Sequence, residues 1–323
     1  MSIQQSTFSP PRHKHELQTT IPTMAPLSID MLQHRMQQMK TMPTLPAILF
    51  PLLRNLDQPP EQVDVPRIVD LISHDKSLAA QCLHMANSPL FGRWGNVDSI
   101  RGAVMALGTG RVRDIAMSCC MLNIMPKDDP LLDPRTFWEH SLGVALVSRR
   151  LARRVGFRDP EKAYLAGLLH DLGMVTNLLL IPEHFRAVVV EAFASKRPFH
   201  NIESEYMGLT HCATGALLSD QWHLSGDIQE VIRWHHGIER ASLYRGLTSL
   251  VHLGDLICRS CGLGYGFAEE PPPDPVTSAG WAILAEECPA VRTMGAARFA
   301  SEMCLYVDEV KRLVGVLFRL ESK

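Results

Sequence analysis

Apolar side chains recur at helical spacing along the chain from Ile29 onward, and this pattern constrains the fold more than any other feature. An early example is the set Ile48, Leu52, Leu53 and Leu56, whose members share one helix face because residues three or four positions apart are neighbours there. We find no convincing alternation of apolar and polar residues, the pattern typical of a half-buried strand. The sequence therefore predicts an all-α fold of helices packed on helices.

Proline and glycine residues divide the pattern into separate helices. In the first half we expect helices over 65–72, 78–87, 100–107 and 111–124. After a loop around 126–134 we expect helices over 137–155, 161–170, 185–195, 202–222, 228–235 and 247–261. Two closing helices are expected over 281–287 and 296–320. The loop marks the boundary between two helical lobes.

Five parts follow from these boundaries. Residues 1–28 are rich in Ser, Thr, Gln and Pro without an apolar period, which predicts a disordered tail. The first helical lobe is expected over 29–126 and the second over 134–262. A linker rich in Gly and Pro is expected over 263–277, followed by the C-terminal helices over 278–323.

Composition bounds the class of protein. The 323 residues are 46% hydrophobic, which is enough for a buried core, and the formal net charge is -2. A chain without an overall positive potential does not bind nucleic acid or an anionic membrane through net charge alone. The N-terminal residues contain no apolar signal segment, and His170 and Asp171 interrupt the most apolar stretch, 165–181. We therefore expect a cytoplasmic protein that binds neither nucleic acid nor membrane.

Eight cysteines are scattered along the chain. Most lie in apolar helical stretches, which predicts buried free thiols. Cys258 and Cys261 have the spacing of a zinc knuckle, but no second pair completes a zinc set. We expect two thiols on one helix.

A dispersed set of histidines and aspartates, at or near predicted helix ends or inside apolar runs, carries the chemistry of the sequence. Imidazole and carboxylate ligands suit Fe, Mn, Zn or Ni, and a pair of such ions can lower the pKa of a bridging water. Any single histidine is more often a capping or packing residue, whereas Asp255 inside an apolar run requires a partner. The candidate metal ligands are His140, His170, Asp171, His211, His235, His236 and Asp255.

Two stretches resemble the HD superfamily of metal-dependent phosphohydrolases. Residues 168–173, Leu-Leu-His-Asp-Leu-Gly, resemble its signature, and residues 137–141 resemble its first metal-ligand helix. The upstream lobe resembles one branch, the HDOD family, over roughly residues 39–261. The stretches that carry this resemblance are 42–46, 84–92 and 99–108, the second of which reads His-Met-Ala-Asn-Ser-Pro-Leu-Phe-Gly.

The resemblance implies a bacterial signalling module that acts through a protein partner, since HDOD proteins generally lack demonstrated catalysis. The related HD-GYP phosphodiesterases place residues like these seven around two or three metals, so the resemblance also implies a divalent metal, Fe, Mn, Zn or Ni. Two features depart from those enzymes: Met174 stands where they carry a phosphate-binding Lys, and no Gly-Tyr-Pro loop follows His236. The resemblance therefore favours a regulatory module without catalytic residues, with an HD-type phosphohydrolase as the alternative.

One predicted helix also carries a basic cluster. Arg149, Arg150, Arg153 and Arg154 share one face at helical spacing. Such a cluster is usually a solvated face, and the alternative is a docking surface for an acidic partner or a phosphate.

Overall fold

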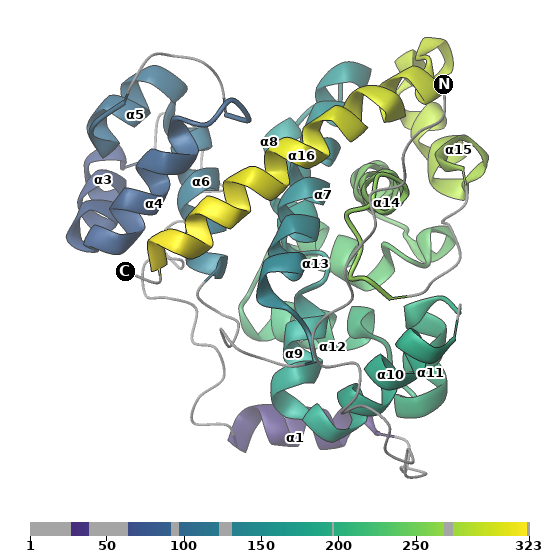
Figure 1. Ribbon diagram of the computed structural model, residues 1–323. Helices are drawn as coiled ribbons and strands as arrows, with labels where there is room; N and C mark the ends of the chain where they lie inside the picture. Colours follow the sequence, from purple (N-terminus) through teal and green to yellow (C-terminus); the bar gives the residue numbers. More distant parts are fainter. Residues whose placement is uncertain are drawn as a thin grey trace.

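The computed structural model describes residues 27–38, 64–91, 97–122, 131–195, 197–267 and 274–321. Every regular element within these residues is a helix, and no strand occurs among them (Figure 1). The prediction of an all-α fold is confirmed. Residues 1–26 of the expected tail, the helix expected around Leu52 and the stretch 42–46 lie outside the described residues.

The first lobe is a group of four helices: α3 (Val65–His74), α4 (Lys76–Ala86), α5 (Ile100–Leu107) and α6 (Thr109–Leu122). Local capping explains where several begin. The Asp64 carboxylate accepts from the Arg67 N–H at 3.0 Å, and Asp75 accepts from the Ser77 and Leu78 N–H groups at 2.9 and 3.0 Å. These bonds satisfy N–H groups that have no partner inside the helix.

Helix α1 (Ile29–Gln38) lies apart from that group, at the bottom of the view in Figure 1. The Leu27 N–H donates to the Met207 carbonyl at 2.9 Å, and the Arg35 guanidinium donates to the Leu180 carbonyl at 3.1 Å. The first described residues therefore pack against the second half of the chain.

The second lobe holds the remaining large helices before residue 262. Its central layer is α7, α8 and α14, which pack closely on one another. Asp133 caps α7, and Gly156, with a φ of 70°, ends it in the left-handed conformation that glycine tolerates best. The helices are α7 (Pro134–Val155), α8 (Pro160–Leu169), α9 (Leu172–Leu180), α10 (Pro182–Ala194), α11 (Phe199–Met207), α12 (His211–Gln221), α13 (Gly226–Trp234) and α14 (Arg245–Ser260).

The structure corrects one predicted helix and adds one. The helix expected over 202–222 is broken after Met207, because Gly208 adopts a φ of 72° and the chain starts again as α12. The added helix is α9, which follows a turn at His170 and Asp171. The stretch Pro160–Leu180 is long and apolar enough to cross a membrane, but 94% of its most apolar window is buried inside the protein, as in a core helix.

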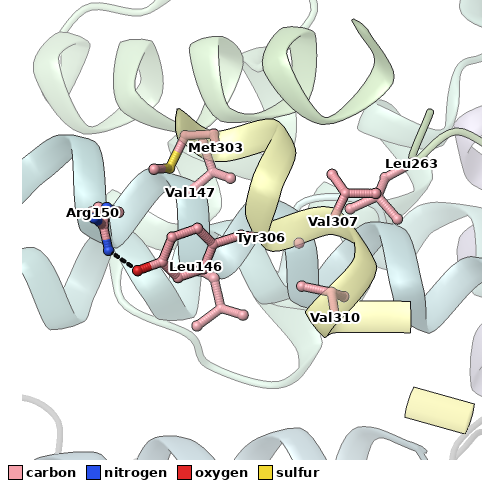
Figure 2. Close-up of a pocket in the computed structure, with 9 residues that line it drawn as sticks. Leu146, Val147, Arg150, Leu263, Met303, Tyr306, Val307 and Val310 are labelled. Carbon is pink, nitrogen blue, oxygen red and sulfur yellow. Dashed lines mark hydrogen bonds between the residues drawn. The ribbon is translucent and has the colours of Figure 1, made fainter. Parts of the chain in front are cut away.

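The C-terminal helices pack on the core. They are α15 (Ala279–Glu287) and α16 (Ala296–Glu321), and α16 crosses α7 and reaches α4 of the first lobe (Figure 1). Figure 2 shows Met303 of α16 beside Val147 of α7 and Val307 beside Leu263, and the Tyr306 hydroxyl accepts a hydrogen bond from Arg150. Helix α16 therefore ties the two lobes together.

A disulfide joins Cys261, at the end of α14, to Cys304 of α16, with their Cα atoms 5.1 Å apart. The prediction of free thiols was wrong for these two residues. Helix α16 brings together cysteines that are 43 residues apart in the sequence, and local sequence patterns do not predict contacts between such distant residues. The other six cysteines are buried and form no disulfide.

Candidate metal centre

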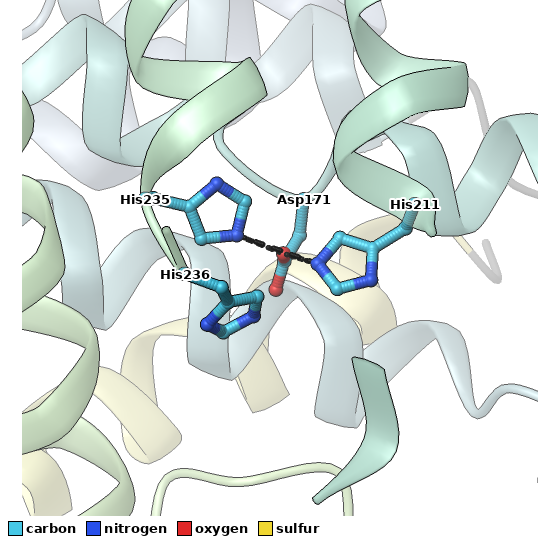
Figure 3. A group of neighbouring side chains, drawn as sticks. All are labelled: Asp171, His211, His235 and His236. Carbon is cyan, nitrogen blue, oxygen red and sulfur yellow. Dashed lines mark hydrogen bonds and ion pairs between the residues drawn. The ribbon is translucent and has the colours of Figure 1, made fainter. Parts of the chain in front are cut away.

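All seven predicted ligands converge at one place in the second lobe. His140 comes from α7, and His170 and Asp171 form the turn between α8 and α9. His211 begins α12, and Asp255 lies on α14. Adjacent histidines 235 and 236 follow α13, and Figure 3 shows them with His211 around Asp171.

Asp171 lies between two pairs of histidines. Its Oδ2 atom is 3.0 Å from the His170 Nε2 atom and 3.5 Å from the His140 Nε2 atom. Its Oδ1 atom is 3.2 Å from the His211 Nε2 atom and 3.3 Å from the His235 Nε2 atom (Figure 3). One carboxylate can therefore serve two ion positions at once.

The remaining ligands complete two groups around this carboxylate. Asp171, His211, His235 and His236 can each offer one donor atom, all within 4.8 Å of one another. His140, His170 and Asp255 form the second group under the same distance, and the Asp255 Oδ1 atom lies 3.4 Å from the His140 Nε2 atom.

The orientation of the rings follows from partners on their other nitrogen. In four of the histidines the Nδ1 atom faces a carbonyl or carboxylate oxygen, which can only accept. Each Nδ1 therefore carries the N–H, and each neutral ring turns an Nε2 lone pair toward the centre. The acceptors are the Leu263 carbonyl for His140 at 2.5 Å, Gly167 for His170 at 2.8 Å, the Glu203 carboxylate for His211 at 2.5 Å, and Ile232 for His235 at 3.1 Å.

These lone pairs face one another in pairs. The Nε2 atoms of His140 and His170 are 3.3 Å apart, and those of His211 and His235 are also 3.3 Å apart. Two lone pairs at this distance repel unless a proton or a cation lies between them. Two ligands of one tetrahedral zinc ion, each about 2.05 Å from it, are about 3.3 Å apart.

The bridging carboxylate gives a second test of fit. The Asp171 Oδ1 atom is buried and makes no hydrogen bond to any described residue, although His211 and His235 lie within 3.3 Å of it. An unsatisfied buried carboxylate oxygen is costly. A cation at this position would satisfy it, so the donor set fits a pair of divalent ions.

Electrostatics at the centre favour positive charge. Burial opposes ionisation of Asp171, yet His170, His211 and His235 hold the pKa of its carboxyl well below the usual range. Burial likewise opposes charge on His235, but the neighbouring Cys212 and Asp171 raise the pKa of this ring to about 10. Without a bound metal, protonated histidine rings such as His235 supply the positive charge beside Asp171.

Sequence reasoning missed two buried groups beside the histidines. The Glu203 carboxylate accepts from the His211 backbone N–H at 2.9 Å and orients the ring through Nδ1. The Cys212 thiol lies 3.8 Å from the His235 Nε2 atom, and although burial acts to raise its pKa, His235 and His211 lower that pKa to about 6. The sequence held one signal for Glu203: an acidic residue directly after Ile202, on the buried face of its helix. The signal for Cys212 was its position directly after His211, a predicted ligand.

A third missed residue, Tyr265, lies in the segment assigned to the linker. Its hydroxyl donates a hydrogen bond to the Asp171 Oδ2 atom, and its ring centroid is 4.7 Å from that of His140. The sequence contains only a Gly-Leu-Gly-Tyr-Gly turn here, which carries no signal for a metal centre.

The basic cluster on α7 is used largely within the chain. Arg149 is buried, 3.7 Å from Asp114 and 3.4 Å from Glu161, and its guanidinium lies 4.6 Å from the centre of the Tyr164 ring. Arg153 also pairs with Glu161, Arg150 with Tyr306, and Arg154 is exposed. A docking role for the cluster stays a prediction.

Comparisons with known proteins agree with this geometry. The model of the HDOD domain family matches residues 42–238. A solved HDOD domain protein of unknown function from Geobacter sulfurreducens is 29% identical, with a TM-score of 0.77 over 88% of this chain and 96% of that one.

Two further solved structures share the fold. One, from Shewanella amazonensis SB2B, has a name that proposes a phosphohydrolase (22% identity, TM-score 0.68, 88% and 97% covered). The other, from Marinobacter aquaeolei VT8, has a name that proposes signal transduction (24% identity, TM-score 0.67, 93% and 63% covered). A curated relative of uncharacterised function from Treponema pallidum (strain Nichols) is 26% identical over 67% of this chain, which spans only 42% of that relative.

Proposed function

This chain belongs to the HDOD domain family, which is related to the HD phosphohydrolases, and we propose that it is a regulatory module of signal transduction. In this proposal it binds a protein partner in the bacterial cytoplasm, and a pair of divalent ions forms a structural or sensory core. It performs no catalytic turnover.

The observation that carries the proposal is the cover over the metal ligands. Six of the seven ligand side chains are at most 4% exposed, and His236 is 18% exposed. The Tyr265 hydroxyl donates a hydrogen bond to the Asp171 Oδ2 atom and so covers one oxygen of the bridging carboxylate. A covered centre suits a sensor or a structural core better than an enzyme that exchanges substrate.

Helix α9 also lacks a cationic side chain that would bind phosphate. Met174, in the first turn after Asp171, is buried and apolar where the phosphodiesterases carry a Lys. When bound, the ions would supply Lewis acidity and a lowered pKa for water. The chain's own residues hold and orient them: Asp171 between the two positions, and Glu203 through the His211 ring.

The alternative is a metal-dependent phosphohydrolase of the HD type. It is favoured by the place of Asp171 between two histidine pairs and by the Arg259 guanidinium, 3.4 Å from the Asp255 Oδ2 atom. Arg259 is a cation within reach of an anionic substrate at the centre. The name of the Shewanella protein agrees with this alternative.

Elemental analysis together with a phosphodiesterase assay tests the proposal. We expect about two ions of Fe, Mn, Zn or Ni per chain and no hydrolysis of cyclic dinucleotides or of bis(p-nitrophenyl) phosphate by the loaded protein. Turnover of about 1 per second, an ordinary enzymatic rate, would refute it if Asp171→Asn abolished that turnover. A partner that binds the metal-loaded wild type but not Asp171→Asn would support a regulatory role.

A further inference from the structure

Residues 263–267 form a short strap over the metal centre, directly after α14. Gly262, directly before the strap, has a φ of 81°, and Gly266, near its far end, has a φ of 76°; glycine at both places allows the chain to turn sharply. The disulfide between Cys261 and Cys304 holds its start against α16. The strap lies beyond residue 238, where the family match ends.

Two apolar side chains anchor the strap. Leu263 is buried in the groove between α7 and α16 that Figure 2 shows, so close to α7 that a Cβ on Gly143 would lie 2.5 Å from its Cδ1 atom. Phe267 stacks on Phe199 of α11, with ring centroids 4.5 Å apart and an interplanar angle of 5°. The strap is thus fastened on both sides of Tyr265.

Between these anchors, Tyr265 points at the bridging carboxylate. Its ring lies between Phe137, with which it stacks at 6.0 Å, and His140, at 4.7 Å. Its hydroxyl reaches the Asp171 Oδ2 atom, the oxygen that also faces His140 and His170. The phenolic oxygen therefore lies next to the carboxylate oxygen that faces the His140 and His170 pair.

We propose that Tyr265 is a further ligand of the ion held by His140, His170 and Asp255, and that the strap closes this position to small anions. The proposal rests on the metal centre of the proposed function. Formation of the bond between the phenolic oxygen and the ion releases the phenolic proton to solvent, and no electron is transferred.

A phenolic ligand makes the ion position richer in oxygen. Two imidazoles with the carboxylates of Asp171 and Asp255 already form a set that suits iron. Addition of Tyr265 fills a coordination position that a water or an exogenous anion would otherwise take. The centre then responds to anions only where the strap is displaced.

Iron provides a direct test, because ferric phenolates absorb visible light. The metal-free full-length protein is loaded with ferrous ammonium sulfate under argon, desalted and oxidised in air, and iron per chain is measured. We expect a visible charge-transfer band in the wild type and tyrosinate vibrations in its resonance Raman spectrum. Tyr265→Phe should lose both while it retains iron and should bind azide at least about tenfold more tightly. Tyr244→Phe, which removes an exposed tyrosine, is the matched control and should retain the band.

The outcomes separate this inference from the proposed function. Iron bound without tyrosinate vibrations, or a band that persists in Tyr265→Phe, overturns the inference and leaves the metal centre intact. A wild type that binds no metal overturns both. The wild-type Raman spectrum decides the question even if the Tyr265→Phe variant does not fold.

Discussion

Replacement of Gly173 by alanine tests how the packing of α9 on α12 builds the metal centre. A Cβ atom on Gly173 would lie 1.7 Å from the His211 carbonyl oxygen and 2.8 Å from the Gly215 N atom. Both are backbone atoms, so no side chain can turn away to make room. The helices themselves must separate.

The size of the effect follows from these distances. Real Cβ contacts are essentially never under 3.0 Å, so the two backbones must move apart by about 1.3 Å from the 1.7 Å contact. If the helices move as rigid bodies and separate along the line between Asp171 Oδ1 and His211 Nε2, the 3.2 Å between these atoms grows to about 4.5 Å. Two ligands of one ion, each about 2.1 Å away, cannot be more than about 4.2 Å apart. One ligand should therefore be lost.

We expect Gly173→Ala to lower the free energy of unfolding by about 3 kcal/mol, the upper part of the range for overpacking. At about 2 °C per kcal/mol for a chain of this size, the metal-free protein should melt about 6 °C lower. Its affinity for the ion at Asp171, His211, His235 and His236 should fall at least about tenfold, because the loss of a ligand exceeds the loss of an outer hydrogen bond. Circular dichroism melts in chelator and competition with a chromophoric chelator measure the two effects.

Gly110→Ala is the matched control. Gly110 lies in the first turn of α6, and no atom would lie within 4 Å of an added Cβ. This variant should be unchanged or more stable by up to about 1 kcal/mol, since alanine restricts the unfolded chain. A Gly173→Ala protein that melts within about 2 °C of the wild type and binds both ions with unchanged affinity would refute the packing argument.

Three further predictions concern groups around the centre and the scaffold. Glu203→Gln removes the charge that orients a ligand ring and should weaken metal binding by about 10–100-fold in the chelator competition; unchanged affinity would contradict that role. Asp227 has a lowered pKa because the Lys162 ammonium and a backbone N–H offset its burial, so its stabilisation is complete above the unfolded pKa of about 3.9 and disappears as the pH falls through the lower folded value. Asp227→Asn should therefore cost on the order of 1 kcal/mol at pH 6 and progressively less as the pH falls below about 3.9 in urea titrations, and a cost independent of pH would disprove the assignment. Cys304→Ser opens a link between residues 43 apart and should cost about 3–4 kcal/mol in oxidising buffer, whereas an equal cost in the presence of dithiothreitol would show that the link to Cys261 is not the cause.

The sequence by itself determined the fold class and the set of candidate metal ligands. The helix over 100–107 was predicted to the residue, since its Ser99 cap and its Gly108 end are local signals. The seven candidate ligands were found from residue type and from a family resemblance, because imidazole and carboxylate groups are the side chains that commonly bind such metals.

Only the tertiary structure decided what surrounds those ligands. Tyr265 is 94 residues from Asp171 in the sequence, and Cys304 is 43 residues from Cys261. These two contacts depend on how the strap and α16 pass over the core, and the spacing of apolar residues in the sequence does not predict that path. Arg149 likewise has the spacing of a surface residue and lies buried, because Asp114 and Glu161 arrive beside it from other helices. Local patterns determine helices and donor atoms, whereas contacts between distant segments determine whether a centre is open or covered.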